Sequence, residues 1–300
     1  MTERNFMKLL RGCWSNGKFV CVGLDSDVGK LPPLAPESLE VDGITVAFSR
    51  QHTFNRAILK ATGDDVCAIK PNTAFYESEG DQGVRDLRAT VAMAHTYAPG
   101  AVVLLDYKRG DIGNTNNGYV TAAFDVFGAD AVTIHPYLGM EAMKPFLDRG
   151  DKGIIVLCRT SNEGAGEFQD RLVVPTPEEA EKWGITTDPM PLYELVAYRV
   201  SREWNYNGNC AVVVGATYPA ELARVRAIVG NMPILIPGVG AQGGTLEDVV
   251  PVGKTTDGQG MIINASRSVI FASGGTDFAE AAAKEVQAMN RVIRPLSRAA

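Results

Sequence analysis

The sequence predicts a (β/α)8 barrel, and three observations lead to that prediction. Eight short apolar runs recur along the 300 residues, with helix-like segments between them. Each run is rich in Val, Ile and Leu without strict alternation, which is typical of parallel strands covered on both faces. The first run leads into Gly23-Leu-Asp25, which is not the G-x-G-x-x-G turn of a dinucleotide-binding sheet. An open doubly wound sheet is the competing fold, and the count of eight and the missing glycine motif favour the barrel.

The strands are expected in the order in which the runs occur. They cover residues 19–24, 66–69, 101–105, 131–134, 153–158, 210–214, 233–236 and 261–263. Three segments between or after them carry helix signals. An apolar stripe predicts a helix over 84–98, and residues 278–289 are rich in Ala and Glu. A third helix is expected over 219–229, with Thr217 as N-cap and Gly230 as the terminating residue.

The longest interruption of this pattern lies at about residues 160–190 and is rich in Gly and Pro. A loop of this length in a barrel is usually a functional lid or an insertion with its own helix. Residues 177–183 are the predicted helix. Since no repeat, low-complexity tract or linker is visible, we expect residues 1–300 to form a single barrel domain that carries this insertion.

Composition excludes several classes of function. The formal charge is −6, from 29 basic and 35 acidic residues, which argues against nucleic acid as a partner. A phosphorylated ligand would therefore need a local cationic pocket. Five cysteines without C-x-x-C spacing, mostly beside apolar runs, are expected to be small buried hydrophobic residues in a reducing cytoplasm. The sequence also has no signal peptide and no apolar run of membrane-spanning length, so no membrane partner is expected.

Ionisable residues gather where the predicted strands end. The run at 101–105 stops at Asp106, Lys108 and Asp111, and charges at a buried strand end are costly unless each has a partner. Asp25 and Lys70 end two other strands. Because the functional face of a barrel lies at the carboxyl ends of its strands, these five groups are expected around one barrel mouth. Such a network would hold its lysines protonated and fixed.

The last two strands are followed by a candidate phosphate site. Residues 237–244 form a Gly-rich loop and residues 264–267 read Asn-Ala-Ser-Arg, at the corner where barrels commonly bind phosphate. Arg267 would supply the cation and Gln242 a side-chain donor. His135, before Pro136 at a strand end, is as consistent with a structural as with a catalytic role.

No metal site is expected from histidine. The three histidines, His52, His95 and His135, lie far apart in the sequence without accompanying ligands. Aspartates alone can hold Mg²⁺ through oxygen ligands, so composition leaves that alternative open.

The segment Asp106-Tyr-Lys-Arg-Gly-Asp-Ile-Gly-Asn-Thr115 resembles the signature of the orotidine 5′-phosphate decarboxylase family. Supporting matches run in order through Val22-Gly-Leu-Asp25, Ile69-Lys-Pro-Asn72, Pro237-Gly-Val-Gly-Ala-Gln-Gly-Gly244 and Asn264-Ala-Ser-Arg267. The length of the chain and Arg159-Thr-Ser-Asn162 are similar to the bacterial subgroup with extended loops.

The resemblance implies conversion of orotidine 5′-monophosphate (OMP) to UMP and CO2 without cofactor or metal. Lys108 would stabilise and then protonate a carbanion at C6, and Asp106 would lie against the departing carboxylate. Lys70 and Asp25 would bind the ribose hydroxyls, with Lys70 also part of the catalytic charge network.

The remaining site residues follow from the same resemblance. Ser161 is expected at the pyrimidine edge, and Gln242 and Arg267 at the phosphate. Pro237 and Gly243 are expected to contact substrate as well. Asp111, as a catalytic residue, and Thr115, as a binding residue, resemble residues that reach into the neighbouring subunit's site, so the resemblance implies a homodimer.

Two rival functions remain open from sequence. A Mg²⁺-dependent sugar-phosphate decarboxylase or aldolase of the same superfamily would have a similar D-x-K-x-x-D string, but it would place a metal-binding Glu where this chain has Lys70. A non-catalytic nucleotide-binding protein is the second rival, and the intact charged motif argues against it.

Overall fold

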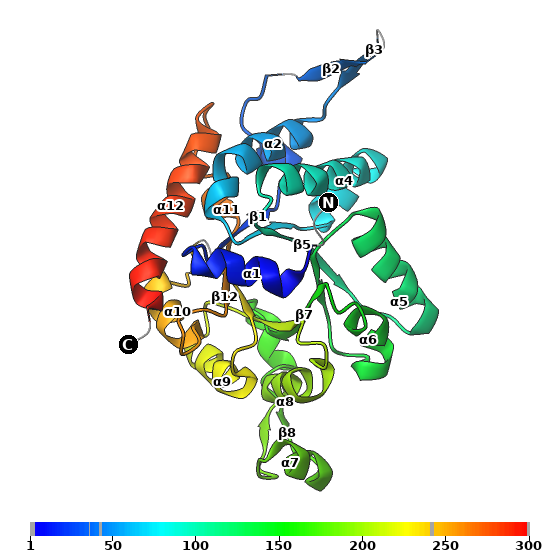
Figure 1. Cartoon of the computed structure of the whole chain (residues 1–300), viewed down its shortest axis with the longest axis vertical. Helices are drawn as coiled ribbons and strands as arrows, with labels where there is room; N and C mark the ends of the chain where they lie inside the picture. The colour runs from blue at the N-terminus through cyan, green and yellow to red at the C-terminus, as the bar shows by residue number, and fades with distance from the viewer. Residues whose placement is uncertain (1–3, 36, 42–43, 241–242, 299–300) are drawn as a thin grey trace.

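The fold is a closed barrel of eight parallel strands surrounded by helices (Figure 1). It comes from a computed structural model that describes residues 4–35, 37–41, 44–240 and 243–298. Around the barrel the strand order is β1-β12-β11-β10-β7-β6-β5-β4. All eight predicted runs form these strands, which confirms the predicted fold class. Their bounds are β1 Val20–Leu24, β4 Ala68–Pro71, β5 Val102–Arg109, β6 Ala131–Ile134, β7 Gly153–Arg159, β10 Cys210–Val214, β11 Ile234–Pro237 and β12 Met261–Ala265.

The helices form the outer layer. They are α1 Phe6–Ser15, α2 Arg50–Thr62, α3 Ala74–Glu77, α4 Gly80–Tyr97, α5 Gly113–Val120, α6 Gly139–Leu147, α7 Pro177–Trp183, α8 Leu192–Arg199, α9 Pro219–Val229, α10 Leu246–Gly253, α11 Arg267–Ile270 and α12 Phe278–Ser297. Two of them, α5 and α8, continue as π-helical turns over Thr121–Val126 and Val200–Trp204. Short 3-10 turns lie at Val28–Lys30, Gly63–Asp65 and Glu163–Glu167.

The predicted helices are present, but one cap is wrong. Helix α9 has the predicted bounds and ends at Gly230, whose φ of 60° suits a residue without a side chain. Its N-cap position is Tyr218 and not Thr217, and no side chain caps it. The Thr217 hydroxyl is buried without a hydrogen-bond partner among the described residues. Pro219 at the first helical position lacks an N–H group, so one of the donors that a cap would satisfy is absent.

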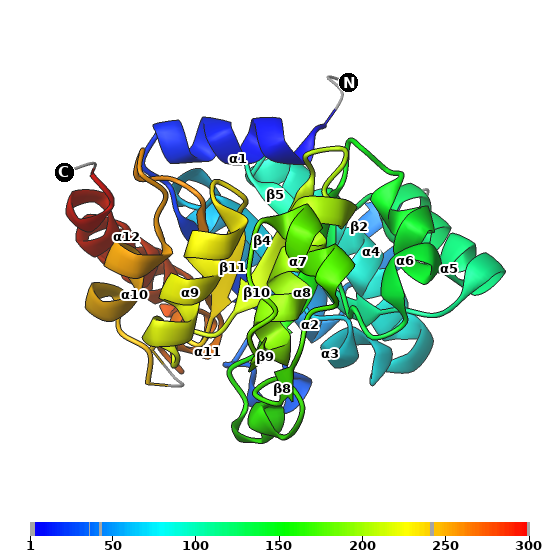
Figure 2. The ribbon, with the colours of Figure 1, turned by 90° about the horizontal axis from the view of Figure 1, so that it is seen from below.

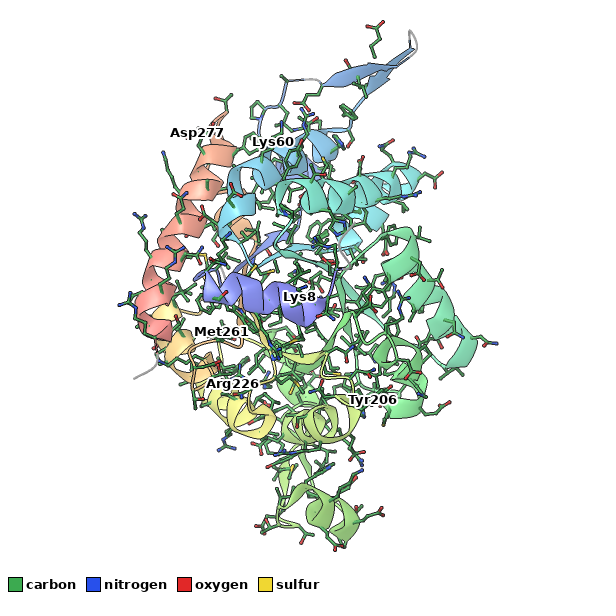
Figure 3. The ribbon with its side chains drawn as sticks, viewed as in Figure 1. Lys8, Lys60, Tyr206, Arg226, Met261 and Asp277 are labelled. Atoms are coloured by element: carbon green, nitrogen blue, oxygen red, sulfur yellow. The ribbon has the colours of Figure 1, made fainter. Side chains whose placement is uncertain are left out.

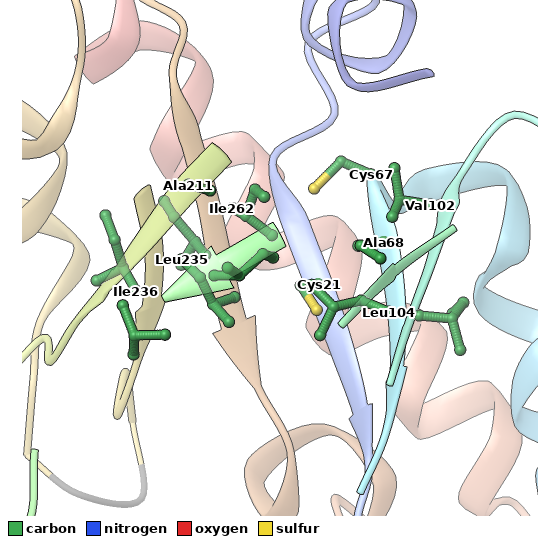
Figure 4. Close-up of a cluster of buried hydrophobic side chains, with 14 of the residues drawn as sticks. Cys21, Cys67, Ala68, Val102, Leu104, Ala211, Leu235, Ile236 and Ile262 are labelled. Carbon is green, nitrogen blue, oxygen red and sulfur yellow. The ribbon is translucent and has the colours of Figure 1, made fainter. Parts of the chain in front are cut away.

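The barrel interior and the layer beneath the helices form one continuous apolar core. Residues of β1, β10 and β12 are all buried. Figure 4 shows Cys21, Ala68 and Leu104 on neighbouring strands within this core. All five cysteines are buried and free, as predicted for small hydrophobic residues.

One end of the barrel is closed by α1, which crosses the front of the barrel in Figure 1. Phe6 of α1 lies against Gly153 at the start of β7, where a Cβ atom would come within 2.5 Å of the Phe6 ring. The Trp14 indole donates a hydrogen bond of 2.8 Å to the carbonyl of Met261, the first residue of β12. In Figure 3, Lys8 marks this helix, and its side chain is exposed. The helix therefore covers the amino ends of the strands and leaves the carboxyl ends for a site.

Two segments of the chain extend outward from the barrel. The long segment after β7 contains the antiparallel pair β8 Leu172–Val173 and β9 Met190–Pro191, and α7 between them. Helix α7 is the predicted one, and Thr176 and Glu179 form a capping box at its start. Figure 2 shows β8 and β9 at the end of the molecule opposite α1. A second antiparallel pair, β2 Ser38–Val41 and β3 Ile44–Ala47, was not predicted.

Among the residues that the structure describes, no helix combines the length and the apolar character needed to cross a membrane.

Candidate active site

A cavity of about 440 Å³ opens at the carboxyl ends of the strands. This is the face on which barrels carry their active sites, and the ends of β1, β4, β5, β6, β7 and β12 contribute polar side chains to it. Seven predicted site residues line the cavity: Asp25, Lys70, Asp106, Lys108, Ser161, Pro237 and Arg267. The other lining residues are Asn72, Thr133, Leu157, Thr160, Asn162, Gln169, Val213, Leu235, Gly238, Val239, Asn264 and Ser266.

The centre of the cavity is an ion network around Asp106. One carboxylate oxygen accepts a hydrogen bond of 2.7 Å from Lys70 Nζ, and the other accepts one from Lys108 Nζ. Asp25 lies farther out, with its Oδ1 atom 4.0 Å from Lys70 Nζ. The two lysines differ in exposure: the Lys70 side chain is 4% exposed and that of Lys108 is 50% exposed. Lys70 is thus a fixed interior charge, whereas Lys108 is open to a ligand in the cavity.

The network keeps its members ionised. Burial alone would raise the pKa of the Asp106 carboxyl, but Lys70 and Lys108 outweigh burial and hold that pKa well below its ordinary value. Burial alone would lower the pKa of the Lys70 ammonium, but the charges of Asp106 and Asp25 outweigh it and raise that pKa. With Arg267, the cavity carries three cations and two carboxylates, a formal surplus of one positive charge that suits an anionic ligand.

The backbone at the network departs from a regular strand. Lys108 has a φ of 46° and is the one non-glycine residue with positive φ in the described part of the chain. Regular pleating, which places alternate residues on one face, is therefore not what brings Asp106 and Lys108 together. Thr133 of the neighbouring strand β6 accepts hydrogen bonds from the N–H groups of Tyr107 and Lys108 in this stretch, and it was not predicted as a site residue.

The segment after β7 forms another wall. Arg159, at the end of β7, makes an ion pair of 2.9 Å with Asp170, and its guanidinium lies 3.9 Å from the centre of the Tyr218 ring. Gln169 accepts a hydrogen bond of 2.8 Å from the Thr160 N–H group and donates one of 2.9 Å to its hydroxyl. These contacts fix both ends of the turn, which places the predicted residue Ser161 at the cavity rim.

Gln169 was also not predicted, because it lies in the long insertion, where sequence periodicity gives no register.

The backbone just after β10 packs closely against the turn that carries Ser161, and the contact is made at Gly215. A Cβ atom there would lie 2.8 Å from the Cα atom of Ser161, so only glycine leaves room for the turn.

The loops after β11 and β12 form the predicted phosphate corner. Pro237 and Gly238 line it, and the φ of 98° at Gly238 requires glycine. Arg267 begins α11 and makes no ion pair with any described residue. Gly243, with a φ of 93°, belongs to the same loop but does not line the cavity. Gln242 lies outside the described residues.

Asp111 and Thr115 lie apart from the cavity of their own chain. The Asp111 carboxylate accepts a hydrogen bond of 2.7 Å from the N–H group of Ile112, and Thr115 is exposed on α5. Four of the five charges expected at the mouth are thus assembled there, and Asp111 is the exception.

His135 has a structural role in this chain. Its Nδ1 atom accepts a hydrogen bond of 3.3 Å from the Tyr137 N–H group, which leaves Nε2, 3.2 Å from the Gly110 carbonyl, as the donor. The ring therefore joins the ends of β5 and β6. The described residues contain no group of three or more His, Cys, Asp or Glu side chains that could hold a metal ion.

Comparisons with known proteins agree with one another. A model of the orotidine 5′-phosphate decarboxylase / HUMPS family matches residues 19–284. The chain is 43% identical over 279 residues to orotidine 5′-phosphate decarboxylase of Cellvibrio japonicus, covering 93% of this chain and 94% of that protein. It is 45% identical over 284 residues to that of Herpetosiphon aurantiacus, covering 94% and 96%. Among solved structures, Leishmania donovani OMP decarboxylase is 33% identical with a TM-score of 0.75, covering 96% and 99%.

Proposed function

The chain belongs to the orotidine 5′-phosphate decarboxylase family and is a carboxy-lyase that converts OMP to UMP and CO2, and from this premise we propose that Lys108 stabilises and then protonates the C6 carbanion. One observation carries the proposal: of the two cavity-lining lysines paired with Asp106, only Lys108 has a half-exposed side chain. Lys70 is enclosed and has no such freedom.

The chemistry requires an electrostatic catalyst. Loss of CO2 from C6 leaves an electron pair in an sp² orbital that is perpendicular to the π system of the ring, so the ring cannot delocalise it. Stabilisation must then come from preorganised charge. The Lys108 ammonium supplies this charge next to C6, and the same group delivers a proton to C6 to form UMP.

Asp106 is proposed to lie beside the substrate carboxylate. Its lowered pKa keeps it anionic, so two like charges approach each other in the bound complex. The repulsion disappears as neutral CO2 leaves.

The rest of the cavity is assigned to substrate binding. Asp25 Oδ1 has no hydrogen-bond partner among the described residues, which suits a carboxylate that accepts from a ribose hydroxyl, with Lys70 adjacent. Ser161 is proposed to bind the pyrimidine edge. Arg267, with Pro237 and Gly243 and with Gln242 outside the described residues, is proposed for the phosphate, whose binding energy would hold the reacting ring in place.

A metal-free reaction is part of the proposal. The carboxylates of Asp106 and Asp25, which would be the oxygen ligands for Mg²⁺, are balanced by the ammonium groups of Lys70 and Lys108. These two cations oppose the binding of Mg²⁺ at the same place. We expect exhaustive dialysis against EDTA to leave kcat unchanged. A loss of activity that added Mg²⁺ restores would instead favour the magnesium-dependent rival.

The active unit is proposed to be a homodimer in which Asp111 and Thr115 serve the partner's site. Both side chains lie outside the cavity of their own chain, which fits residues that serve a neighbouring subunit. A cytoplasmic location is proposed as well, because all five thiols are unpaired.

Subunit mixing tests the shared site. Asp111→Ala and Arg267→Ala proteins, each weak alone, are expected to regain activity when mixed. If Asp111 crosses the interface, each mixed dimer has one intact site, so random exchange restores about one quarter of all sites. Activity is measured as OMP absorbance loss. Mixed dimers that are demonstrably present but inactive would place the whole site within one chain.

A further inference from the structure

The pairing between β5 and β6 is interrupted beside the ion network. Leu105 pairs with Val132, and the next pair is Arg109 with Ile134. Asp106, Tyr107 and Lys108 therefore lie opposite a single residue of β6, Thr133. The extra residues form a bulge, and a bulge next to an active site commonly redirects a side chain.

The hydroxyl oxygen of Thr133 makes three hydrogen bonds to the residues of this bulge. It accepts a hydrogen bond of 2.9 Å from the Tyr107 N–H group and one of 3.0 Å from the Lys108 N–H group. It also donates a hydrogen bond of 3.2 Å to Asp106 Oδ1, the oxygen that binds Lys108 Nζ. A hydroxyl has one donor and two acceptor positions, so all three are used on this segment.

We propose that Thr133 is a positioning residue for the decarboxylation, because its hydroxyl holds the left-handed backbone at Lys108 and orients the Asp106 carboxylate toward Lys108. Strained backbone persists only where its surroundings determine it. Two successive N–H groups of this segment depend on the one hydroxyl, and the Thr133 side chain is 1% exposed. Without the hydroxyl, the two N–H groups lose their acceptor, and water has little access to replace it. The segment is then free to relax, which moves the Lys108 ammonium.

A set of isosteric variants separates this role from simple packing. Thr133→Val keeps the shape and removes the hydroxyl, whereas Thr133→Ser keeps the hydroxyl and removes the methyl group. Thr62→Val is the matched control: Thr62 is also fully buried and its hydroxyl donates 2.8 Å to the Ile58 carbonyl within α2, away from the cavity.

Displacement of a reacting group by about 1 Å costs on the order of 10²-fold in rate. We therefore expect Thr133→Val to lower kcat by roughly 10- to 100-fold, with KM for OMP and Kd for UMP nearly unchanged because Thr133 is assigned no contact with product. Thr133→Ser should recover most of the lost kcat, and Thr62→Val should match wild type.

Three results would overturn the proposal: wild-type kcat in Thr133→Val, equal losses in the Val and Ser variants, or a rise in Kd for UMP that matches the loss in kcat. If Thr133→Val does not fold, Thr133→Cys replaces the hydroxyl with a weaker hydrogen-bonding group, and its kcat must then fall below that of Thr133→Ser. The inference rests on the proposed role of Lys108. That role fails if the turnover of Lys108→Ala is within tenfold of wild type, whereas the Val and Ser comparison tests Thr133 separately.

Discussion

Replacing Lys108 with alanine is expected to lower kcat by about 10⁴-fold or more, because one substitution removes both the charge that stabilises the carbanion and its proton donor. General acids contribute roughly 10²- to 10⁴-fold, and single preorganised electrostatic groups roughly 10²- to 10³-fold. Lys70 cannot replace Lys108, since its ammonium is enclosed and bound to Asp106 at 2.7 Å. The measurement is the loss of OMP absorbance at saturating substrate.

A second measurement isolates the proton transfer. The step that protonates C6 must also run in reverse, so wild-type enzyme in D2O is expected to exchange the C6 hydrogen of UMP for deuterium. Lys108→Ala should not catalyse this exchange while still binding UMP. Lys144→Ala is the matched control, because Lys144 is an exposed lysine on α6 paired with Asp148 at 2.8 Å. Turnover within tenfold of wild type in Lys108→Ala would refute the role assigned to Lys108.

The barrel could be predicted because each of its strands is marked by a local signal in the sequence. Each strand is a continuous apolar run, and parallel closure leaves few ways to arrange eight of them. The strand ends were predicted less well: β5 runs to Arg109, beyond the predicted 105, because polar residues follow its apolar run, and two of them, Asp106 and Lys108, line the cavity. The β2–β3 hairpin was missed although the sequence carries a signal for it, because polar and apolar residues alternate over Ser38–Val41 and an Asp-Gly turn dipeptide follows.

The ionisable part of the site was also predictable, because charges at buried strand ends need partners and the fold places those ends together. Asp25, Lys70, Asp106 and Lys108 were found in this way, and the structure joins them in one cavity. Asp111 could be separated from them only through the family resemblance.

Thr133 and Gln169 could not be predicted, for different physical reasons. Thr133 acts through the register between two strands, and a bulge changes that register without any sign in the sequence of β6. A threonine within an apolar strand is an ordinary β-sheet residue. Gln169 reaches the cavity because the Arg159–Asp170 ion pair folds the insertion back onto β7, a contact that neither composition nor periodicity indicates.

The second large effect is expected on stability, from Asp106. Asp106→Ala would leave the Lys70 ammonium, 4% exposed, with only Asp25 at 4.0 Å. Breaking a buried ion pair by removing one partner costs about 3–5 kcal/mol, so the free energy of unfolding should fall by that amount at pH 7. Lys70→Met is the matched variant. It should cost less, because Asp106 keeps Lys108, and because replacing a buried charge with an apolar group removes a desolvation cost.

The stability that is lost in Asp106→Ala is expected to depend on pH. The pKa of Asp106 is lowered by folding, so its stabilising contribution is present above its unfolded pKa of about 3.9 and is lost as the pH falls toward the lower folded value. The pKa of Lys70 is raised, so its contribution is present below about pH 10.4 and is lost only as the pH rises through the folded value. The stability difference between wild type and Asp106→Ala, measured by urea unfolding, should therefore be constant from about pH 5 to 9 and shrink in acid.

A double variant tests the contact between the two groups. When Asp106→Ala and Lys70→Met are combined, the loss in free energy of unfolding should be less than the sum of the two single losses, because the two groups are in contact. Additive costs, or a difference that grows in acid, would show that the two groups do not stabilise each other in the folded protein.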